Sequence, residues 1–394
     1  MSIIELLKEE KIWDEFLKYK IEGGHLSKQQ QTELEEYIKN KKYEPIIEKI
    51  INKEPFSIST VKHINKKNST KKRTVFLFNE NENYVFKAIM FLLYKYDYIF
   101  SPNLYSFRQH IGVKTAVDNI TKKDVKTMYG YKVDIHNYFN SVDTNIIIDI
   151  LRNKINNDEL LVDFICSIIS ENKAYYNGDI ITCQKGIMAG VPISGFLANL
   201  YLSELDKWFY ENNILYARYS DDIIVFGETE KDVDKYKEKI KSFLAEQKLT
   251  INKDKEFDIK PNQKIDFLGF TFIDGEVDLS DVALQKMKDK MKRKAKALLR
   301  WKTKNKTSAE RAIRAYIRHF NKKFFDNPKN NEITWCRWYF PIITTDNSLH
   351  ILDDYMLQNI RYIATGKHTK ANYNLKYEKT KEYGFRSLVH AYYN

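Results

Sequence analysis

Two adjacent carboxylates between short apolar segments constrain the fold of this chain more than any other feature. Asp221 and Asp222 lie between Leu215–Tyr219 and Ile223–Phe226, which both have the length and composition of buried β-strands. Carboxylates beside buried strands repel each other and lose hydration, so a nearby cation would offset their cost. The same pair in an arbitrary chain more often marks a simple hairpin turn, because Asp is a common turn residue. The rest of the sequence has to decide between a turn and a cation site.

A third acid occupies a similar setting. Asp134 ends the apolar segment Tyr131–Ile135 and is followed by Tyr138 and Phe139. Mg²⁺ is the natural candidate for such a set, since it prefers carboxylate and phosphate oxygens, with Mn²⁺ as its substitute. Two such ions about 3.5–4 Å apart can activate an attacking hydroxyl and stabilise a leaving pyrophosphate.

Length and composition set wider limits. The 394 residues are enough for two or three lobes, and the 43% hydrophobic content supports a sizeable core. No apolar run is long enough to span a membrane, and the N-terminus lacks the features of a signal peptide. Cys166, Cys183 and Cys336 are too few and too scattered for a disulfide framework. We therefore expect a cytoplasmic protein with no membrane partner.

The excess positive charge is local. Residues 283–325 carry sixteen Lys or Arg against two acids, so the net charge of +12 leaves the rest of the chain slightly negative. Such a segment attracts phosphate backbones, although a solvated helix face is the alternative. The predicted nucleic-acid contacts are Lys292, Arg293, Lys296, Arg300, Trp301, Arg314 and Arg318.

The pattern of elements changes near residue 275. Before it, the sequence predicts two helices in 1–50, mixed strands and helices, and a hairpin over 175–182 with Asn177-Gly178 at its turn. After it, the pattern is helical, and Met287, Met291 and Ala295 share one face. No internal repeat or low-complexity linker is present.

The order of the motifs resembles the palm of reverse transcriptases. Seven elements between residues 60 and 275 match that family in order: Lys72-Arg73, Ser106-Phe107-Arg108, Val133–Phe139, Gly186–Asn199, Tyr219–Asp222, Leu249–Lys255 and Phe267–Phe270. Each element alone is weak, and the ordered set is specific.

The resemblance implies a role for each matching position. Asp134, Asp221 and Asp222 would be the catalytic acids and would hold two metal ions, with Asp222 the weaker ligand. Phe139 would be the aromatic gate that excludes a 2′-hydroxyl and selects dNTPs, with core packing as the alternative. The other implied nucleotide contacts are Lys72, Arg73 and Arg108 at the triphosphate, Gly190 and Pro192 near the templating pair, and Lys255 as proton donor to pyrophosphate. An exposed basic loop is the alternative for Lys72 and Arg73, and an ordinary surface lysine for Lys255.

The sequence also departs from the common family pattern. Lys185 stands where Gln usually precedes the first glycine of the second motif, and Gln184 comes one residue earlier. Met188-Ala189-Gly190 replaces the Pro-Gln-Gly core of group II intron enzymes. Together with Tyr383–Leu388, this variant resembles the bacterial unknown-group enzymes linked to abortive infection and antiphage defence.

We therefore expect an α+β right-hand polymerase. Its predicted parts are an N-terminal helical extension (1–55), reverse-transcriptase fingers and palm (56–275), and a mostly helical, basic, thumb-like region (276–394). The implied function is RNA-directed DNA polymerase activity in antiphage defence, by two-metal addition of dNTPs to a 3′-hydroxyl. The implied partners are an RNA template or non-coding RNA, the DNA product, and a second copy of the chain or a co-encoded protein.

Two alternatives stay open. The same site could carry out template-independent or protein-primed DNA synthesis, for which the tail offers the hydroxyls of Tyr373, Tyr377, Tyr383, Tyr392 and Tyr393. The chain could also be a nucleic-acid-binding scaffold without turnover, although three intact acids argue against it.

Overall fold

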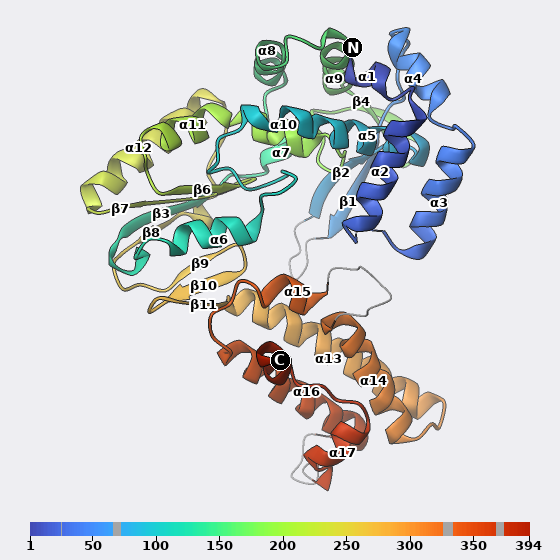
Figure 1. Cartoon of the computed structure of the whole chain (residues 1–394), viewed down its shortest axis with the longest axis vertical. Helices are drawn as coiled ribbons and strands as arrows, with labels where there is room; N and C mark the ends of the chain where they lie inside the picture. The colour runs from blue at the N-terminus through green and yellow to red at the C-terminus, as the bar shows by residue number, and fades with distance from the viewer. Residues whose placement is uncertain (25, 66–71, 326–333, 368–373) are drawn as a thin grey trace. The chain divides into compact units, whose positions relative to one another are not determined.

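Figure 1 shows the computed structural model of the chain, which describes residues 1–24, 26–65, 72–325, 334–367 and 374–394. They form two compact units, one of Met1–Glu22 with Leu26–Pro261 and one built on Asn262–Asn394. Residues 66–71, which directly precede the finger motif Lys72-Arg73, and the tail tyrosine Tyr373 lie outside the described residues. Helices and sheets are mixed throughout, as the predicted α+β class requires.

The central sheet of the first unit has the strand order β6-β7-β3-β8 and is antiparallel throughout. Its strands are β3 (Tyr129–Asp134), β6 (Tyr216–Tyr219), β7 (Asp222–Gly227) and β8 (Phe257–Ile259). Three helices pack against it, namely α6 (Val113–Thr121), α11 (Ser203–Glu211) and α12 (Glu230–Glu246). Tyr131 and Val133 of β3 are fully buried, so the centre of this sheet lies in the core.

A second sheet has the order β2-β1-β4-β5. Its strands are β1 (Thr60–Asn65), β2 (Lys72–Leu77), β4 (Lys173–Tyr176) and β5 (Asp179–Thr182). The last two form the predicted hairpin, and Asn177 and Gly178 at its turn have φ values of 54° and 100°. This sheet carries the predicted finger motif Lys72-Arg73 at the start of β2.

Helices complete the first unit. They are α1 (Ile3–Leu6), α2 (Glu10–Glu22), α3 (Lys28–Lys39), α4 (Glu44–Ile51), α5 (Glu80–Leu93), α7 (Tyr138–Ser141), α8 (Thr144–Lys154), α9 (Glu159–Ser170) and α10 (Ser194–Tyr201), with 3₁₀ turns at Tyr94–Ile99, Val125–Thr127 and Lys253–Lys255. The first fifty residues form four helices instead of the predicted two, because additional breaks follow Leu6 and Lys39. The buried Asp158 carboxylate accepts from the Ser2 hydroxyl (2.6 Å) and the Ile3 amide (2.7 Å), which ties α1 to α9.

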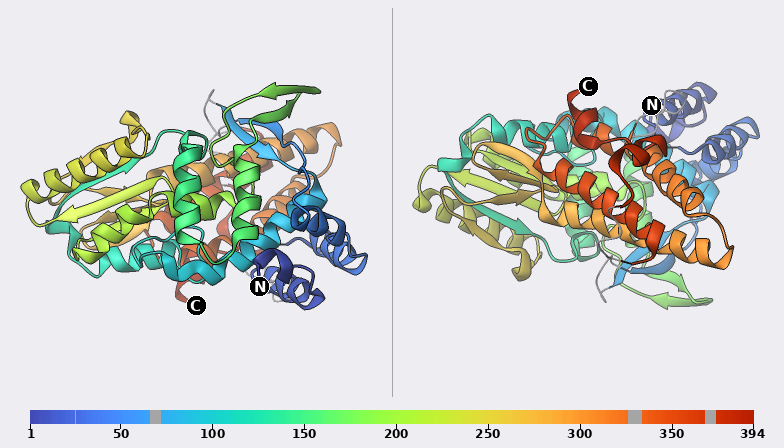
Figure 2. Two further views of the ribbon diagram at one scale, coloured as in Figure 1. Left: turned by 90° about the horizontal axis from the view of Figure 1, so that it is seen from above. Right: turned by 90° about the horizontal axis from the view of Figure 1, so that it is seen from below.

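The second unit combines a small sheet with a helical bundle. The sheet has the order β11-β10-β9, with strands β9 (Ile265–Phe267), β10 (Phe270–Ile273) and β11 (Glu276–Leu279). The helices are α13 (Asp281–Lys304), α14 (Ala309–Phe324), α15 (Trp335–Tyr339), α16 (Asn347–Thr365), α17 (Tyr377–Glu382) and α18 (Leu388–Tyr393). Helices α13, α14 and α16 pack on one another and run side by side in Figure 2.

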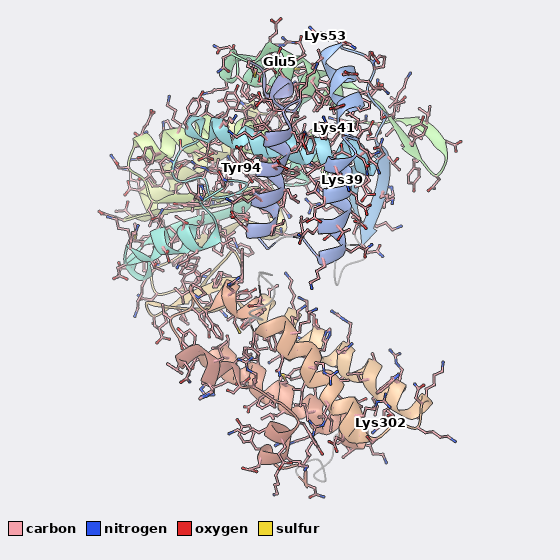
Figure 3. The ribbon with its side chains drawn as sticks, turned by 45° about the vertical axis from the view of Figure 1, so that its right-hand side comes forward. Glu5, Lys39, Lys41, Lys53, Tyr94 and Lys302 are labelled. Carbon is pink, nitrogen blue, oxygen red and sulfur yellow. The ribbon has the colours of Figure 1, made fainter. Side chains whose placement is uncertain are left out.

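Sequence periodicity explains the first helix of that bundle. Ser280 caps α13 by accepting from the Ala283 amide, and Met287, Met291 and Ala295 are buried on one face, as predicted. At the other end of α13, the Lys302 ammonium (labelled in Figure 3) donates to the Ile363 and Ala364 carbonyls (2.7 and 3.0 Å). The lysine thus satisfies open carbonyls in the last turn of α16. Among the described helices, none combines the length and apolarity needed to cross a membrane.

Candidate active site

The turn between β6 and β7 brings the tandem acids beside the end of β3. The hairpin register leaves Ser220 and Asp221 as a two-residue turn, and Ser220 has a φ of 60°. Asp134 and Asp222 stand opposite each other in the β3–β7 register, and the Ile135 amide donates to the Asp221 carbonyl (3.1 Å). Three acids that are far apart along the sequence therefore become neighbours at one end of the sheet.

These acids destabilise one another in their charged forms. Burial raises the pKa of Asp221, and the charge of Asp134 raises it further. Burial also raises the pKa of Asp222 to about 6; Lys132 opposes the rise, whereas Asp221 and Asp134 add to it. Asp134 itself is only 4% exposed. The cluster therefore favours any positive charge that can lie among its oxygens.

One such charge is Lys255. Its ammonium lies 2.6 Å from an Asp134 carboxylate oxygen, and the Asn252 side-chain amide donates to the other oxygen (3.2 Å). Burial lowers the pKa of Lys255, but its hydrogen bond and charge interaction with Asp134 outweigh this and raise it overall. The Asn252 backbone amide also donates to the Asp134 carbonyl (2.9 Å). These hydrogen bonds connect the Leu249–Lys255 motif to the first acid, Asp134.

The chemistry of this donor set fits a divalent cation. Its carboxylates are hard oxygen ligands, which Mg²⁺ prefers. Because they repel one another, a bound Mg²⁺ would offset their negative charge. In the described part of the chain, no group of three or more His, Cys, Asp or Glu side chains has a preformed metal-binding arrangement. The fit therefore rests on the type, burial and mutual repulsion of the donors.

An arginine and two aromatic rings lie next to the acids. The Arg73 guanidinium lies 6.0 Å from the centroid of the Phe139 ring, and its charge slightly opposes the rise in the pKa of Asp221 that burial causes. Phe139 is half-buried and meets Phe107 edge-on at 6.0 Å. Lys72 precedes Arg73 on β2 and is exposed. The structure thus brings Arg73, Phe139 and Asp221 together, as the resemblance implies, while the Lys72 ammonium has no hydrogen bond or ion pair within the described residues.

The glycine-containing second motif packs closely against both β2 and α7. Gly190 has a φ of 106°, and a Cβ there would lie 3.0 Å from the Phe76 carbonyl oxygen. The Phe76 amide donates to the Ala189 carbonyl (2.8 Å). A Cβ on Gly186 would lie only 2.3 Å from the Phe139 carbonyl oxygen. Both glycines allow backbone approaches that another residue would block.

Pro192 follows this loop and is half-buried just before α10. The predicted contacts of Gly190 and Pro192 with a templating pair concern a ligand and stay predictions.

A buried network that the sequence reasoning missed supports the acidic turn. Arg218 and Asp206 are fully buried, and the guanidinium donates to both carboxylate oxygens (2.8 and 2.5 Å). Arg218 also donates to the Ser220 carbonyl (3.1 Å), and the Ser220 amide donates to the Ser106 hydroxyl (2.8 Å). Ser106 in turn donates to Asn199 (2.9 Å). The visible signal was an arginine directly before the Tyr219–Asp222 motif, in an otherwise apolar strand.

Arg108 has a different place from the predicted one. Its side chain is only 6% exposed and forms a two-pronged pair with Asp97 (2.8 and 2.7 Å). It also donates to the Ser101 and Leu104 carbonyls (2.8 and 3.1 Å). Its guanidinium is used inside the fold and is not presented to a triphosphate. The sequence could not reveal this, because the pairing depends on the 3₁₀ turn that contains Asp97.

Gln184 and Lys185 face different hollows. Gln184 lines an open hollow of about 480 Å³ with Thr74, Asn137 and Asn140, next to the Val133–Phe139 motif. Lys185 is 4% exposed and lines a separate pocket beside α9. Gln184 therefore shares its hollow with residues of the first motif, although the family pattern would place the glutamine one residue later.

Most of the basic side chains that the sequence predicts as nucleic-acid contacts are exposed on the second unit. Lys292, Arg293, Lys296 and Arg300 are exposed along α13, and Arg318 is exposed on α14. The five side chains are therefore open to solvent, and their contacts with nucleic acid stay predictions.

Two other predicted contacts have partners within the fold. Trp301 is half-buried with the Arg311 guanidinium 5.9 Å from its ring centroid. Arg314 pairs with Glu310 (2.8 Å), donates to the Glu382 carbonyl (3.2 Å) and lies 4.9 Å from the Tyr383 ring centroid. Arg314 therefore connects α14 with the end of α17.

The first unit has the fold and the acidic site of a polymerase palm with attached fingers. The chain belongs to the reverse transcriptase (RNA-dependent DNA polymerase) family, whose sequence profile matches residues 64–272, just over half of its length.

Curated relatives support this placement. The chain is 25% identical over 195 residues to the group II intron-encoded protein LtrA of Lactococcus lactis, a match that covers 48% of this chain and 32% of that protein. It is 29% identical over 133 residues to the retron Ec83 reverse transcriptase of Escherichia coli, covering 32% of this chain and 39% of that enzyme. The match thus spans about a third of the length of these relatives.

The chain is also similar to solved telomerase structures. A telomerase from Candida albicans in complex with a TWJ fragment of telomeric RNA is 13% identical, with a TM-score of 0.47 over 88% of this chain and 68% of that one. An apo telomerase from Candida tropicalis is 13% identical, with a TM-score of 0.44 over 84% of this chain and 69% of that one.

Proposed function

We propose that this protein is an RNA-directed DNA polymerase that adds dNTPs to a 3′-hydroxyl with the help of two divalent ions. The observation that carries the proposal is the convergence of Asp134, Asp221 and Asp222 at the ends of β3 and β7. Family membership supports the same reaction class, since the matched region contains all three acids.

The acids would hold the metal. Asp134 and Asp221 are the proposed shared ligands of two Mg²⁺ ions, and Asp222, which lies opposite Asp134 in the sheet, is the weaker third acid. When bound, the ions supply Lewis-acid stabilisation of the attacking and leaving oxygens. Mn²⁺ would serve the same site. The protein preorganises the acids, because the buried Arg218 side chain donates to the Ser220 carbonyl and so fixes the acidic turn.

Other side chains would select and orient the nucleotide. Arg73 presents a guanidinium beside Phe139 and within electrostatic reach of Asp221, where it could pair with triphosphate oxygens. Lys72 would add a second charge from the same strand. The half-buried Phe139 ring would leave no room for a ribose 2′-hydroxyl. Lys255, now paired with Asp134, would be the proton donor to pyrophosphate when a cation takes over that carboxylate.

The nucleic acid would be held mainly by charge. The four exposed bases Lys292, Arg293, Lys296 and Arg300 of α13, with Arg318 of α14, form a surface suited to phosphate backbones. Similarity to an intron-encoded protein and a retron reverse transcriptase favours RNA as the template and DNA as the product.

Primer extension tests this proposal. Purified full-length protein with Mg²⁺ and labelled dNTPs should extend a DNA primer on an RNA template. Asp234→Asn, which changes an exposed acid of α12 outside the cluster, is the control for the quality of the protein preparation and should extend the primer as wild type does. Lack of incorporation on RNA and DNA templates alike would contradict the polymerase and favour a binding scaffold.

Protein-primed synthesis is the second candidate, and one tail tyrosine favours it. Tyr393 is 68% exposed, and its hydroxyl donates to Asp346 (3.2 Å), a carboxylate that could accept the phenolic proton. The Tyr392 hydroxyl instead donates to the Ile343 carbonyl (2.8 Å), and the Tyr383 ring lies against the Arg314 guanidinium. Tyr377 is 36% exposed and less accessible than Tyr393.

Label transfer tests this second candidate. Incubation with labelled dNTPs but no added nucleic acid should give label that migrates with the protein and shifts after protease treatment. The label should disappear in Tyr393→Phe and persist in Tyr377→Phe. Persistence of the label in Tyr393→Phe would exclude this residue as the primer.

We further propose antiphage defence with a non-coding RNA as the biological setting, on the sequence resemblance alone. Sequencing of RNA that copurifies with the protein tests the RNA partner, and plaque counts on cells expressing wild type or Asp221→Asn test defence. Equal plaque counts with and without the wild-type protein would contradict the defensive role for the phages used.

A further inference from the structure

A pocket separate from the acidic cluster lies between the end of α4, residues 53–57 and α9. Its volume is about 320 Å³, within the range of small-molecule sites. Phe56, Phe78 and Phe164 form much of its apolar wall, and Phe56 meets Phe164 edge-on with ring centroids 5.2 Å apart. The pocket lies wholly within the first unit.

Lys185 supplies a buried positive group to this pocket. The residue is only 4% exposed, and within the described residues its ammonium has no hydrogen bond or ion pair. Burial lowers the pKa of Lys185, and the more distant charge of Glu171 only partly offsets this. Its carbonyl accepts from the Met188 amide (3.0 Å), so the backbone that directs the side chain is held in a turn. Water has little access to a lysine that is so little exposed, so an anion that joins its ammonium would be favoured.

Other polar groups around the pocket have partners. Lys53 pairs with Asp163 (2.9 Å), and one Glu171 oxygen accepts from the Lys173 amide (2.8 Å). Figure 3 labels Lys53 at the end of α4, where its side chain is 64% exposed. The pocket thus combines an aromatic wall with one ammonium, that of Lys185, that forms no ion pair within the described residues.

We propose that this pocket binds a small organic monocarboxylate with an aromatic or aliphatic body. The carboxylate would pair with the Lys185 ammonium, and the body would pack against Phe56 and Phe164. A single charge is favoured over a phosphate dianion, because Glu54, Asp163 and Glu171 also line the pocket and would repel a second negative charge. The site does not depend on the proposed polymerase activity.

Calorimetric titration of the full-length protein tests the site, with 2-naphthoate, phenylacetate and octanoate as probes. At least one should bind saturably, one per chain, and 2-naphthamide, the neutral analogue of the first probe, should bind at least about tenfold more weakly than 2-naphthoate. Lys185→Met should weaken binding of the probe by about tenfold or more, whereas Lys49→Met, at an exposed lysine of α4 outside the pocket lining, should stay within about twofold. Absence of saturable binding by all three acids, or equal affinity in Lys185→Met, would overturn the proposal.

A second pair of variants leaves the lysine in place. Ser167 lines the pocket from α9 and is exposed, so Ser167→Trp should fill the space and abolish binding. Ser170→Trp places the same ring on the same helix outside the pocket and should bind the probe like wild type. Undiminished binding by Ser167→Trp would show that the probe lies elsewhere and would contradict the site.

Discussion

At the residue scale, buried charged side chains in this protein occur in two arrangements, as an opposite-charge pair and as a cluster of like charges. Arg218 and Asp206 are fully buried, and each satisfies the other through two hydrogen bonds. Asp134, Asp221 and Asp222 instead share their burial with like charges. The first arrangement holds the fold, and the second leaves a demand for positive charge that a substrate-bound cation can meet.

Removal of Arg218 should cost much more than removal of a surface partner. Arg218→Met leaves Asp206 buried and unpaired, so the free energy of unfolding should fall by about 3–5 kcal/mol. Arg152→Met, at an exposed partner of Asp163, should cost less than about 1 kcal/mol. Urea denaturation measures both values, and similar losses in the two variants would contradict the structural role of Arg218.

The Phe139 ring should decide sugar selection. Phe139→Ala removes the group proposed to block a 2′-hydroxyl, so rNTP use relative to dNTP use should rise on the order of tenfold, about 1.4 kcal/mol of discrimination. Competition between labelled rNTP and dNTP in primer extension measures the ratio. Phe257→Ala, at a ring that is 53% exposed on β8, is the matched control and should leave the ratio unchanged.

At the scale of elements, the site depends on how strands and loops are joined. The strand ends that carry the acids and the hairpin with Asn177-Gly178 could be predicted, because apolar period and turn chemistry are local properties of the sequence. The pairing of Arg108 with Asp97, and of Arg218 with Asp206, could not, since each depends on tertiary packing of segments that local patterns do not connect. The two additional breaks in the first fifty residues, after Leu6 and Lys39, were likewise missed, because residues 7–9 and 40–43 contain no proline or glycine.

Two glycines with similar φ values allow the cost of backbone strain to be measured apart from the cost of a close backbone contact. Gly178 (φ 100°) has open space around a built Cβ, whereas Gly190 (φ 106°) faces the Phe76 carbonyl at 3.0 Å. Gly178→Ala should cost about 1–2 kcal/mol of conformational strain. Gly190→Ala should lower the melting temperature further and reduce extension activity, because it pushes β2 away from the second motif. Equal melting temperatures and activities would contradict that account of the loop.

At the scale of the whole molecule, charge and chemistry reside in different units. The acids lie in the first unit, and the exposed bases of α13 and α14 lie in the second. The sequence pattern changes near residue 275, whereas the compact units divide after Pro261, because β9 and β10 form their sheet with β11 in the second unit. Strand partners, which sequence periodicity does not reveal, account for the difference.

Neutralisation of the basic surface should weaken nucleic-acid binding in a salt-dependent way. The quadruple change of Lys292, Arg293, Lys296 and Arg300 to Gln should lower the slope of log affinity against log salt by roughly 0.7–0.9 per lost phosphate contact. The control removes the same charge from the exposed Lys8, Lys28, Lys39 and Lys42. Fluorescence anisotropy with an RNA–DNA duplex at several salt concentrations measures both slopes, and equal slopes would contradict the assignment of this surface.

The most direct measurement of the central claim is a titration of the protein with Mn²⁺, followed by electron paramagnetic resonance of the free ion. Wild type and Asp234→Asn should remove the same amount of Mn²⁺ from solution, and the double variant Asp134→Asn with Asp221→Asn should remove far less while keeping the wild-type melting temperature. If the double variant binds Mn²⁺ as wild type does, the three acids do not form the metal site, and the proposed catalytic mechanism is wrong.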